Sequence, residues 1–160
     1  MSRSNLAAVV IGAALTLAPV VAKPAAGMND LVVRESKRNV SETIDALAAA
    51  LEAKGIKVIA RVDHAAGAKA VGMDLRPSEV LLFANPKLGT PLMQSNPEIG
   101  IDLPMKALAW QASDGRVYLG YTAPDKLKAR YGIKDRDAEF NAMADALLKF
   151  SEVAGAASAK

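Results

Sequence analysis

Short strand-like segments alternate with helical segments along this chain, and that alternation constrains the fold more than any other feature. In residues 56–63 every second residue is apolar, as in a half-buried strand, while 80–84 is an unbroken apolar run. Residues 40–51 and 140–150 instead repeat their apolar positions every three or four residues, which is typical of amphipathic helices. The two periods together predict a fold of the α/β class.

The predicted order of elements is βαβαβαββαα, in one compact domain with helices packed on a mixed five-stranded sheet. The predicted strands are 31–35, 56–63, 80–84, 105–111 and 117–121. The predicted helices begin near residues 40, 64, 91, 122 and 135. The limits of the domain are therefore 31–133, with an amphipathic helix over 134–153 and a frayed tail over 154–160.

Several boundaries have a clear chemical signal. Asn39 and Glu42 have the spacing of a capping box, and Gly55 suits the left-handed position after a helix. Asp114-Gly115 predicts a tight hairpin turn between the last two strands. Thr90 is predicted to cap a short helix whose first turn holds Pro91.

The first 22 residues have the three parts of a secretory signal peptide. Arg3 supplies a positive charge, an uncharged apolar run follows, and Val20 and Ala22 have the spacing of a cleavage site. We therefore expect cleavage after Ala22, a flexible lead-in over 23–30, and a periplasmic or secreted protein. An N-terminal anchor that stays uncleaved is the alternative, since the run is short for a membrane span.

The composition excludes several classes of function. The chain has no cysteine, so it forms neither a disulfide nor a lipid-modified N-terminus, and its one histidine argues against a structural zinc site. The 20 Lys and Arg residues nearly balance the 17 Asp and Glu residues, and only Arg3 lies in the predicted signal peptide. We expect no nucleic-acid partner, no membrane contact after cleavage and no cofactor implied by sequence, and we leave any cofactor open.

His64, the only histidine, follows Asp63 at the predicted end of a strand and start of a helix. The positive end of the helix dipole favours the neutral imidazole, which is the form that acts as a general base. His64 is therefore a candidate catalytic base, with Asp63 or Asp102 to orient it. The alternative is structural: Asp63 caps the helix and His64 makes only local hydrogen bonds.

Topology suggests how these residues could meet. If the helix after Asp63 is a right-handed crossover, the strands before and after it are parallel, and His64 and Asn85 share one sheet edge. Asp102 and Tyr121 reach that edge if the next strand runs antiparallel. Asn85, Thr90 and Tyr121 are thus candidate ligand-binding residues at the edge where open α/β sheets bind ligands. A crossover within the long connection 86–104 would instead carry Asp102 to the opposite edge.

Methionines offer a second, weaker signal in a protein predicted to be exported. Met73, Met93 and Met105 are soft ligands, but their spacing fits core filling better than a metal site. We therefore predict no metal site. Walker A, GxGxxG, HExxH and GxSxG motifs are absent from the sequence.

Several of these segments together resemble the family called domain of unknown function 302. The matching pieces are the helix with Ser41, Thr43 and Leu47, then Gly55, Asp63-His64, Phe83-Ala84-Asn85-Pro86, Gly89-Thr90-Pro91-Leu92-Met93, Asp102-Leu103-Pro104 and Tyr121. They span residues 33 to about 132, with Ala84 at a position where the family more usually has glycine. The resemblance implies a compact α/β fold that is often dimeric, and it implies no particular reaction.

Three functions follow as hypotheses. The first is the binding of a small molecule at the edge that carries His64, Asn85 and Asp102, since no complete set of nucleophile, base and orienting group can be assigned. The second is a small enzyme that uses His64 as general base on a carbonyl or ester compound. The third is a homodimeric interaction module whose C-terminal helix makes the contact.

Overall fold

The structure is a computed structural model that describes residues 30–157, so the predicted signal peptide and most of the lead-in lie outside the described residues. The strands are β1 (Leu31–Ser36), β2 (Lys57–Asp63), β3 (Ser78–Ala84), β4 (Met105–Gln111) and β5 (Val117–Thr122). The helices are α1 (Val40–Glu52), α2 (His64–Ala70), α3 (Pro86–Ser95), α4 (Pro124–Arg130) and α5 (Asp137–Gly155), with a short 3-10 helix η1 (Pro97–Ile101) before β4. The predicted α/β class, five strands and element order are confirmed.

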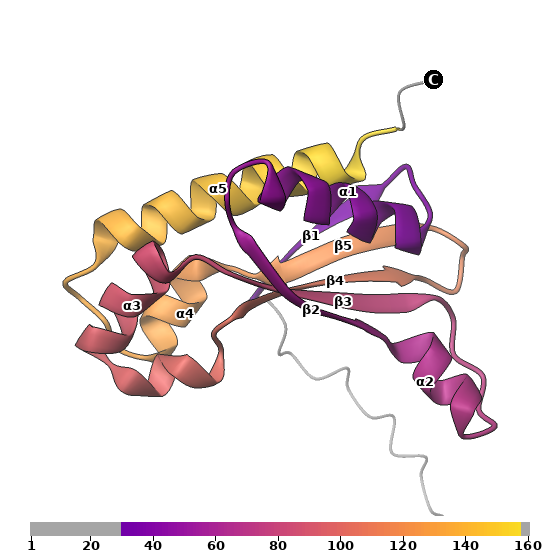
Figure 1. Cartoon of the computed structure of the whole chain (residues 1–160), viewed down its shortest axis with the longest axis horizontal. Coiled ribbons are helices and arrows are strands. Elements are labelled where there is room, and N and C mark those ends of the chain that lie inside the picture. The colour runs from indigo at the N-terminus through magenta and orange to yellow at the C-terminus, as the bar shows by residue number, and fades with distance from the viewer. Residues whose placement is uncertain (1–29, 158–160) are drawn as a thin grey trace, which may run out of the picture.

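The five strands form one open sheet in the order β1-β5-β4-β3-β2, so β1 and β2 are its two edges. Helices α1 and α5 lie side by side over one face of this sheet (Figure 1). The C-terminal end of α5 is fastened to the first loop of the domain. Two carbonyl groups there, those of Val153 and Ala154, accept hydrogen bonds from the Arg38 guanidinium at 2.9 and 2.8 Å.

All neighbouring strands are antiparallel, so the predicted mixed sheet and the parallel pairing of β2 with β3 are wrong. Asp63, at the end of β2, pairs with Glu79 near the start of β3. The connection is short for a crossover. Its 14 residues, 64–77, are close to the minimum of about a dozen, and the seven residues of α2 cover only about 10 Å of the ~23 Å along a strand.

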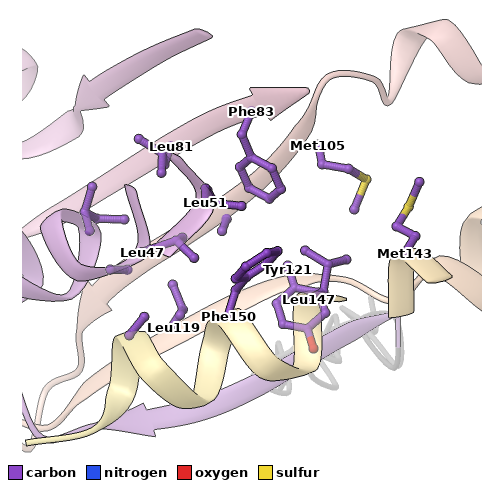
Figure 2. Close-up of a cluster of buried hydrophobic side chains, with 14 of the residues drawn as sticks. Leu47, Leu51, Leu81, Phe83, Met105, Leu119, Tyr121, Met143, Leu147 and Phe150 are labelled. Carbon is purple, nitrogen blue, oxygen red and sulfur yellow. The ribbon is translucent and has the colours of Figure 1, made fainter. Parts of the chain in front are cut away.

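The core lies between the sheet and the α1–α5 layer (Figure 2). Ile44 and Leu51 of α1 are fully buried, as the predicted helical stripe requires. Phe140, Met143, Leu147 and Phe150 of α5 are buried too, and the latter three lie beside the side chains of β3, β4 and β5. The amphipathic helix at the C-terminus therefore packs on the sheet of its own chain.

The start of α3 differs from the prediction. Asn85 caps this helix, its side chain accepting a hydrogen bond from the Lys87 N–H, and Pro86 occupies the first turn. Thr90 lies inside the helix rather than at its cap. The Asn85-Pro86 pair is thus a helix start, because proline lacks the N–H that a first-turn residue leaves without a helical partner.

The second face of the sheet is partly exposed and carries apolar side chains together with the exposed Lys106 of β4. Along β3 the burial alternates strictly, with Leu81 and Phe83 buried toward the helices and Val80 and Leu82 half-exposed on the other side. The edge strand β2 carries a bulge near Ile59, where its register against β3 shifts. Among residues 30–157 no helix is both long and apolar enough to cross a lipid bilayer.

Candidate functional site

A cavity of about 370 Å³ opens between α3, α5 and the ends of β2, β3 and β4. Its walls come from segments distant in sequence, because antiparallel pairing brings the end of β3 next to the start of β4. Nearly all of the lining side chains are apolar, namely Ile56, Ile59, Phe83, Leu88, Met93, Leu103, Met105, Met143, Ala146, Leu147 and Phe150. The volume lies within the range of small-molecule sites, which are mainly apolar with a few polar groups.

Two polar side chains, both predicted as ligand-binding residues, line this cavity. Asn85 stands where β3 ends and α3 begins, and Thr90 lies one turn into α3. The Oδ1 atom of Asn85 is used by the helix cap, at 3.1 Å from the Lys87 nitrogen, which leaves its Nδ2 hydrogens to offer to a ligand. Thr90 is exposed and can donate or accept through its hydroxyl.

Asp102 lies at the same end of the sheet, but it does not line the cavity. Its carboxylate accepts hydrogen bonds from the Arg130 guanidinium and the Tyr131 hydroxyl, both at 2.7 Å. Partial burial acts to raise the pKa of Asp102, but the hydrogen bonds from Tyr131 and Arg130 outweigh it and keep the pKa below its ordinary value. Asp102 therefore fastens the segment that precedes β4, and Leu103 of that segment lines the cavity.

Tyr121 reaches the same end of the sheet and is buried beneath α5, where Figure 2 shows it next to Leu147 and Phe150. Burial raises the pKa of the Tyr121 phenol, opposed by a hydrogen bond with Ser151 and by the charge of Arg34. The side chain is part of the core and does not line the cavity. Of the six predicted site residues, Asn85 and Thr90 alone line it.

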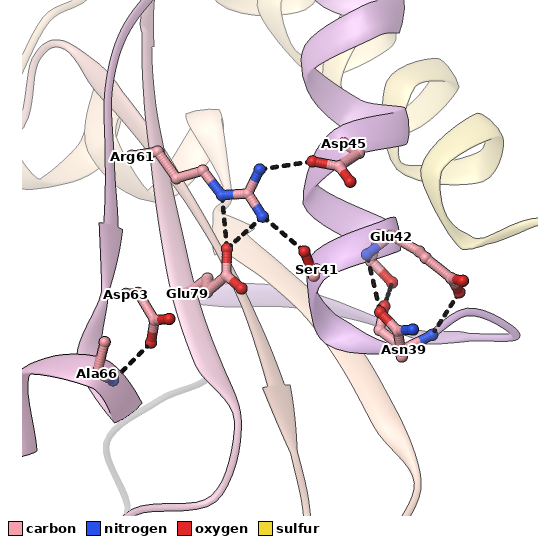
Figure 3. A network of polar contacts seen from close by, with 9 residues as sticks. Asn39, Ser41, Glu42, Asp45, Arg61, Asp63, Ala66 and Glu79 are labelled. Carbon is pink, nitrogen blue, oxygen red and sulfur yellow. Dashed lines mark hydrogen bonds and ion pairs between the residues drawn. The ribbon is translucent and has the colours of Figure 1, made fainter. Parts of the chain in front are cut away.

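His64 and Asp63 lie at the opposite end of the sheet from Asn85 and Asp102. The prediction that His64 shares an edge with those two residues is wrong, because β2 and β3 are antiparallel and Asp63 pairs with Glu79. His64 is exposed in the first turn of α2. The Asp63 carboxylate caps that helix, accepting a hydrogen bond from the Ala66 N–H at 2.9 Å (Figure 3). The alternative interpretation, that Asp63 caps the helix, is therefore correct.

A polar network that the sequence analysis missed surrounds Arg61 (Figure 3). Its guanidinium donates to the buried carboxylate of Glu79, at 2.6 Å from Nε, and also to Asp45 and Ser41 of α1. Desolvation is the largest single effect and lowers the pKa of Arg61. Hydrogen bonds and charges from Asp45 and Glu79 together outweigh it, so the pKa of Arg61 lies above its ordinary value. The network ties α1 to the edge of the sheet.

The predicted methionine core fillers divide between two environments. Met105 is buried and Met93 lies at the cavity. Met73 is exposed, so the prediction that it fills the core is wrong. Within residues 30–157 no group of three or more His, Cys, Asp or Glu side chains is arranged to hold a metal ion. The wall of the cavity that α5 supplies, from Met143 to Phe150, appeared in the sequence only as an apolar stripe. Periodicity identifies the apolar face of a helix, but not the cavity between that face and its neighbours.

Comparison with known proteins extends this description. The family model described as "Domain of unknown function DUF302" matches residues 32–150, so the match includes most of α5, which the sequence motifs by themselves did not reach. A solved structure titled as an uncharacterized conserved protein DUF302 from Bacillus stearothermophilus has the same fold. Its TM-score is 0.71 at 19% identity, and the match covers 79% of this chain and 99% of that one.

Curated relatives are longer than this chain. Fluoride-specific ion channel FluC 1 of Brucella suis is 46% identical over 103 residues, which are 64% of this chain and 41% of that protein. Fluoride-specific ion channel FluC 1 of Brucella abortus is also 46% identical over 103 residues, 38% of its length. The chain thus spans about two fifths of these relatives, and the similarity concerns one part of each.

Proposed function

This chain belongs to the DUF302 family, and from that premise we propose that its domain binds a small, largely apolar molecule in the cavity between α3 and α5. The cavity itself supports this proposal. It has more than twice the volume of an apolar cavity of about 150 Å³ that accepts benzene. The ligand that fits best is an uncharged molecule of drug-fragment size with one hydrogen-bonding group.

Two features of the walls bear on which ligands the cavity accepts. Three of the lining residues are methionines, Met93, Met105 and Met143, whose flexible thioethers adapt to apolar ligands of varied shape. Polar groups enter from one side only, through Asn85 and Thr90. An apolar ligand with a carbonyl or hydroxyl group would place that group against the Asn85 amide.

The compartment in which binding would occur follows from the first 22 residues. Their signal-peptide pattern supports a periplasmic or secreted protein, in which the cavity would meet small molecules outside the cytoplasm. Native mass spectrometry of the protein purified from its own periplasm would report export, ligand and oligomeric state together.

The test of binding uses N-phenyl-1-naphthylamine, a neutral apolar dye whose fluorescence rises in apolar sites. We expect the wild-type protein to bind the dye and Ala146→Phe, which fills the cavity from α5, to lose most of that binding. Ala142→Phe is the matched control, since Ala142 is exposed on the same helix and does not line the cavity. Equal dye binding by all three proteins, with all three folded, would refute the proposed site.

Thr90→Val and Asn85→Asp test the polar contacts. The first removes a hydroxyl at nearly constant volume, and the second keeps the helix-capping oxygen but removes the amide donors. We expect either change to weaken binding of a co-purified ligand with a hydrogen-bonding group, while the dye, which fills only apolar space, binds as before. Unchanged affinity for that ligand would remove Asn85 and Thr90 from the site.

A further inference from the structure

Three of the six methionines of the chain line the cavity between α3 and α5, and each comes from a different element. Met93 belongs to α3, Met105 begins β4 and Met143 belongs to α5. Figure 2 shows the thioethers of Met105 and Met143 extending toward each other from the sheet and the helix. The sequence analysis grouped Met73 with Met93 and Met105. That Met143 belongs with the latter two instead follows only from the fold.

The three thioethers lead from the solvent into the interior of the cavity. Met93 is 39% exposed, whereas Met105 and Met143 are each 6% exposed. The Sδ atom of Met93 lies near Gly100 of η1, at 3.6 Å from the position of a Cβ built there. Methionine has three rotatable side-chain bonds, so this sulfur can turn toward the other two without movement of the backbone. A ligand that enters from solvent therefore meets one sulfur first and two more inside.

The chemistry of the lining selects the kind of ion that such a site would take. Thioethers are soft, neutral ligands that favour Cu(I), and the equally soft Ag(I) shares this preference. Among the described residues that line the cavity, none carries the carboxylate, imidazole or thiolate groups that hold zinc and calcium ions. A monovalent ion brings one charge rather than two into apolar surroundings, which lowers the cost of burial. Phe83 and Phe150 also line the cavity, and aromatic faces attract cations.

We propose that Met93, Met105 and Met143 bind one monovalent soft cation, Cu(I) or Ag(I), through their three sulfur atoms. The proposal concerns the same cavity as the proposed function, but it requires no apolar ligand and can fail separately from it. The chain offers no thiol that would compete for such an ion, since it has no cysteine. Its one imidazole, that of His64, lies at the opposite end of the sheet.

Titration with Ag(I), followed by NMR of protein labelled with ¹³C at the methionine methyl groups, tests the proposal. We expect the methyl signals of Met93, Met105 and Met143 to shift as Ag(I) is added. The Met73 signal should stay in place, because Met73 is exposed in the loop between α2 and β3 and does not line the cavity. For Cu(I), anaerobic competition with the chelator bathocuproine disulfonate in the presence of ascorbate measures the affinity.

Met105→Leu and Met143→Leu each remove one sulfur at nearly constant volume, so the fold and the apolar cavity persist. We expect either variant to lose most of the Ag(I) and Cu(I) binding and to bind N-phenyl-1-naphthylamine as the wild-type protein does. Met73→Leu is the matched control, since it makes the same change at a methionine outside the cavity. It should bind both ions as the wild-type protein does.

Methyl signals of Met105 and Met143 that stay in place at excess Ag(I) overturn the proposal, as does ion binding that survives in both leucine variants. Binding that His64→Gln abolishes and the leucine variants keep also overturns it, because the ion would then lie on the imidazole. If Ag(I) shifts the three methyl signals and the dye does not bind, the metal site stands and the apolar ligand is refuted. If the dye binds and the signals do not shift, the reverse holds.

Discussion

At the scale of single residues, charged side chains in this domain mainly hold separate segments of the chain together. Asp102 accepts hydrogen bonds from two side chains of one segment, and Arg130 of that segment also binds Asp30 at the start of the described chain. One carboxylate thereby joins the N-terminal edge, the end of α4 and the segment before β4. Asp102, which the sequence suggested as a possible catalytic carboxylate, therefore holds these segments together.

Asp102→Asn should lower the free energy of unfolding by about 1 kcal/mol at neutral pH, because an uncharged amide replaces a carboxylate held by Arg130 and Tyr131. The pKa of Asp102 is lowered in the folded protein. Its contribution is therefore complete above the unfolded value of about 4 and is lost as the pH falls through the folded value. The melting-temperature difference between wild type and variant, measured from pH 7 to pH 3, should shrink toward zero. A constant difference would contradict this account.

Arg61→Met should destabilise the protein by about 2 kcal/mol, because Glu79 would remain buried without its partner. The value allows for solvent screening, since the Arg61 side chain is 36% exposed. The double variant Arg61→Met/Glu79→Leu should recover most of the loss. Urea unfolding of the three proteins measures both effects. A double variant no more stable than Arg61→Met would show that the unpaired Glu79 carboxylate does not cause the loss.

At the scale of elements, helix α1 begins as its sequence predicts. The Asn39 Oδ1 atom accepts from the Glu42 N–H at 2.9 Å, and the Glu42 carboxylate accepts from the Asn39 N–H at 3.2 Å. Asn39→Ala should cost about 1 kcal/mol of stability, measured by thermal unfolding. Glu42→Gln keeps the reciprocal bonds and serves as the control. Equal melting temperatures for wild type and Asn39→Ala would mean that the cap adds nothing here.

Local signals predicted well those elements that depend on neighbours in sequence. The capping box, the Asp114-Gly115 hairpin and the left-handed Gly55 all appear as expected, with positive φ at both glycines. The direction of β3 relative to β2 depends instead on the length and path of the whole connection 64–77, which no local pattern reports. That one error moved His64 to the wrong end of the sheet. The cavity could not be predicted either, because its walls meet only in three dimensions.

At the scale of the whole molecule, α5 is an integral part of the fold. It supplies Phe140, Leu147 and Ala154 to the core, and its end binds Arg38. A chain ending at residue 134 should therefore lose cooperative unfolding, since the apolar face of α1 and the sheet would lose their cover. Circular dichroism during heating checks this, with a chain ending at residue 157 as control. A sharp transition in the shorter chain would contradict it.

The bulge near Ile59 affects how readily strands of other molecules can add to the edge of this sheet. An exposed edge strand is a template on which foreign strands can add, and β2 is such an edge. The extra residue interrupts the evenly spaced row of amide and carbonyl groups, and it sharpens the local twist. An incoming strand cannot pair along the full length of β2, so this border resists amyloid-like growth without any need for a covering helix.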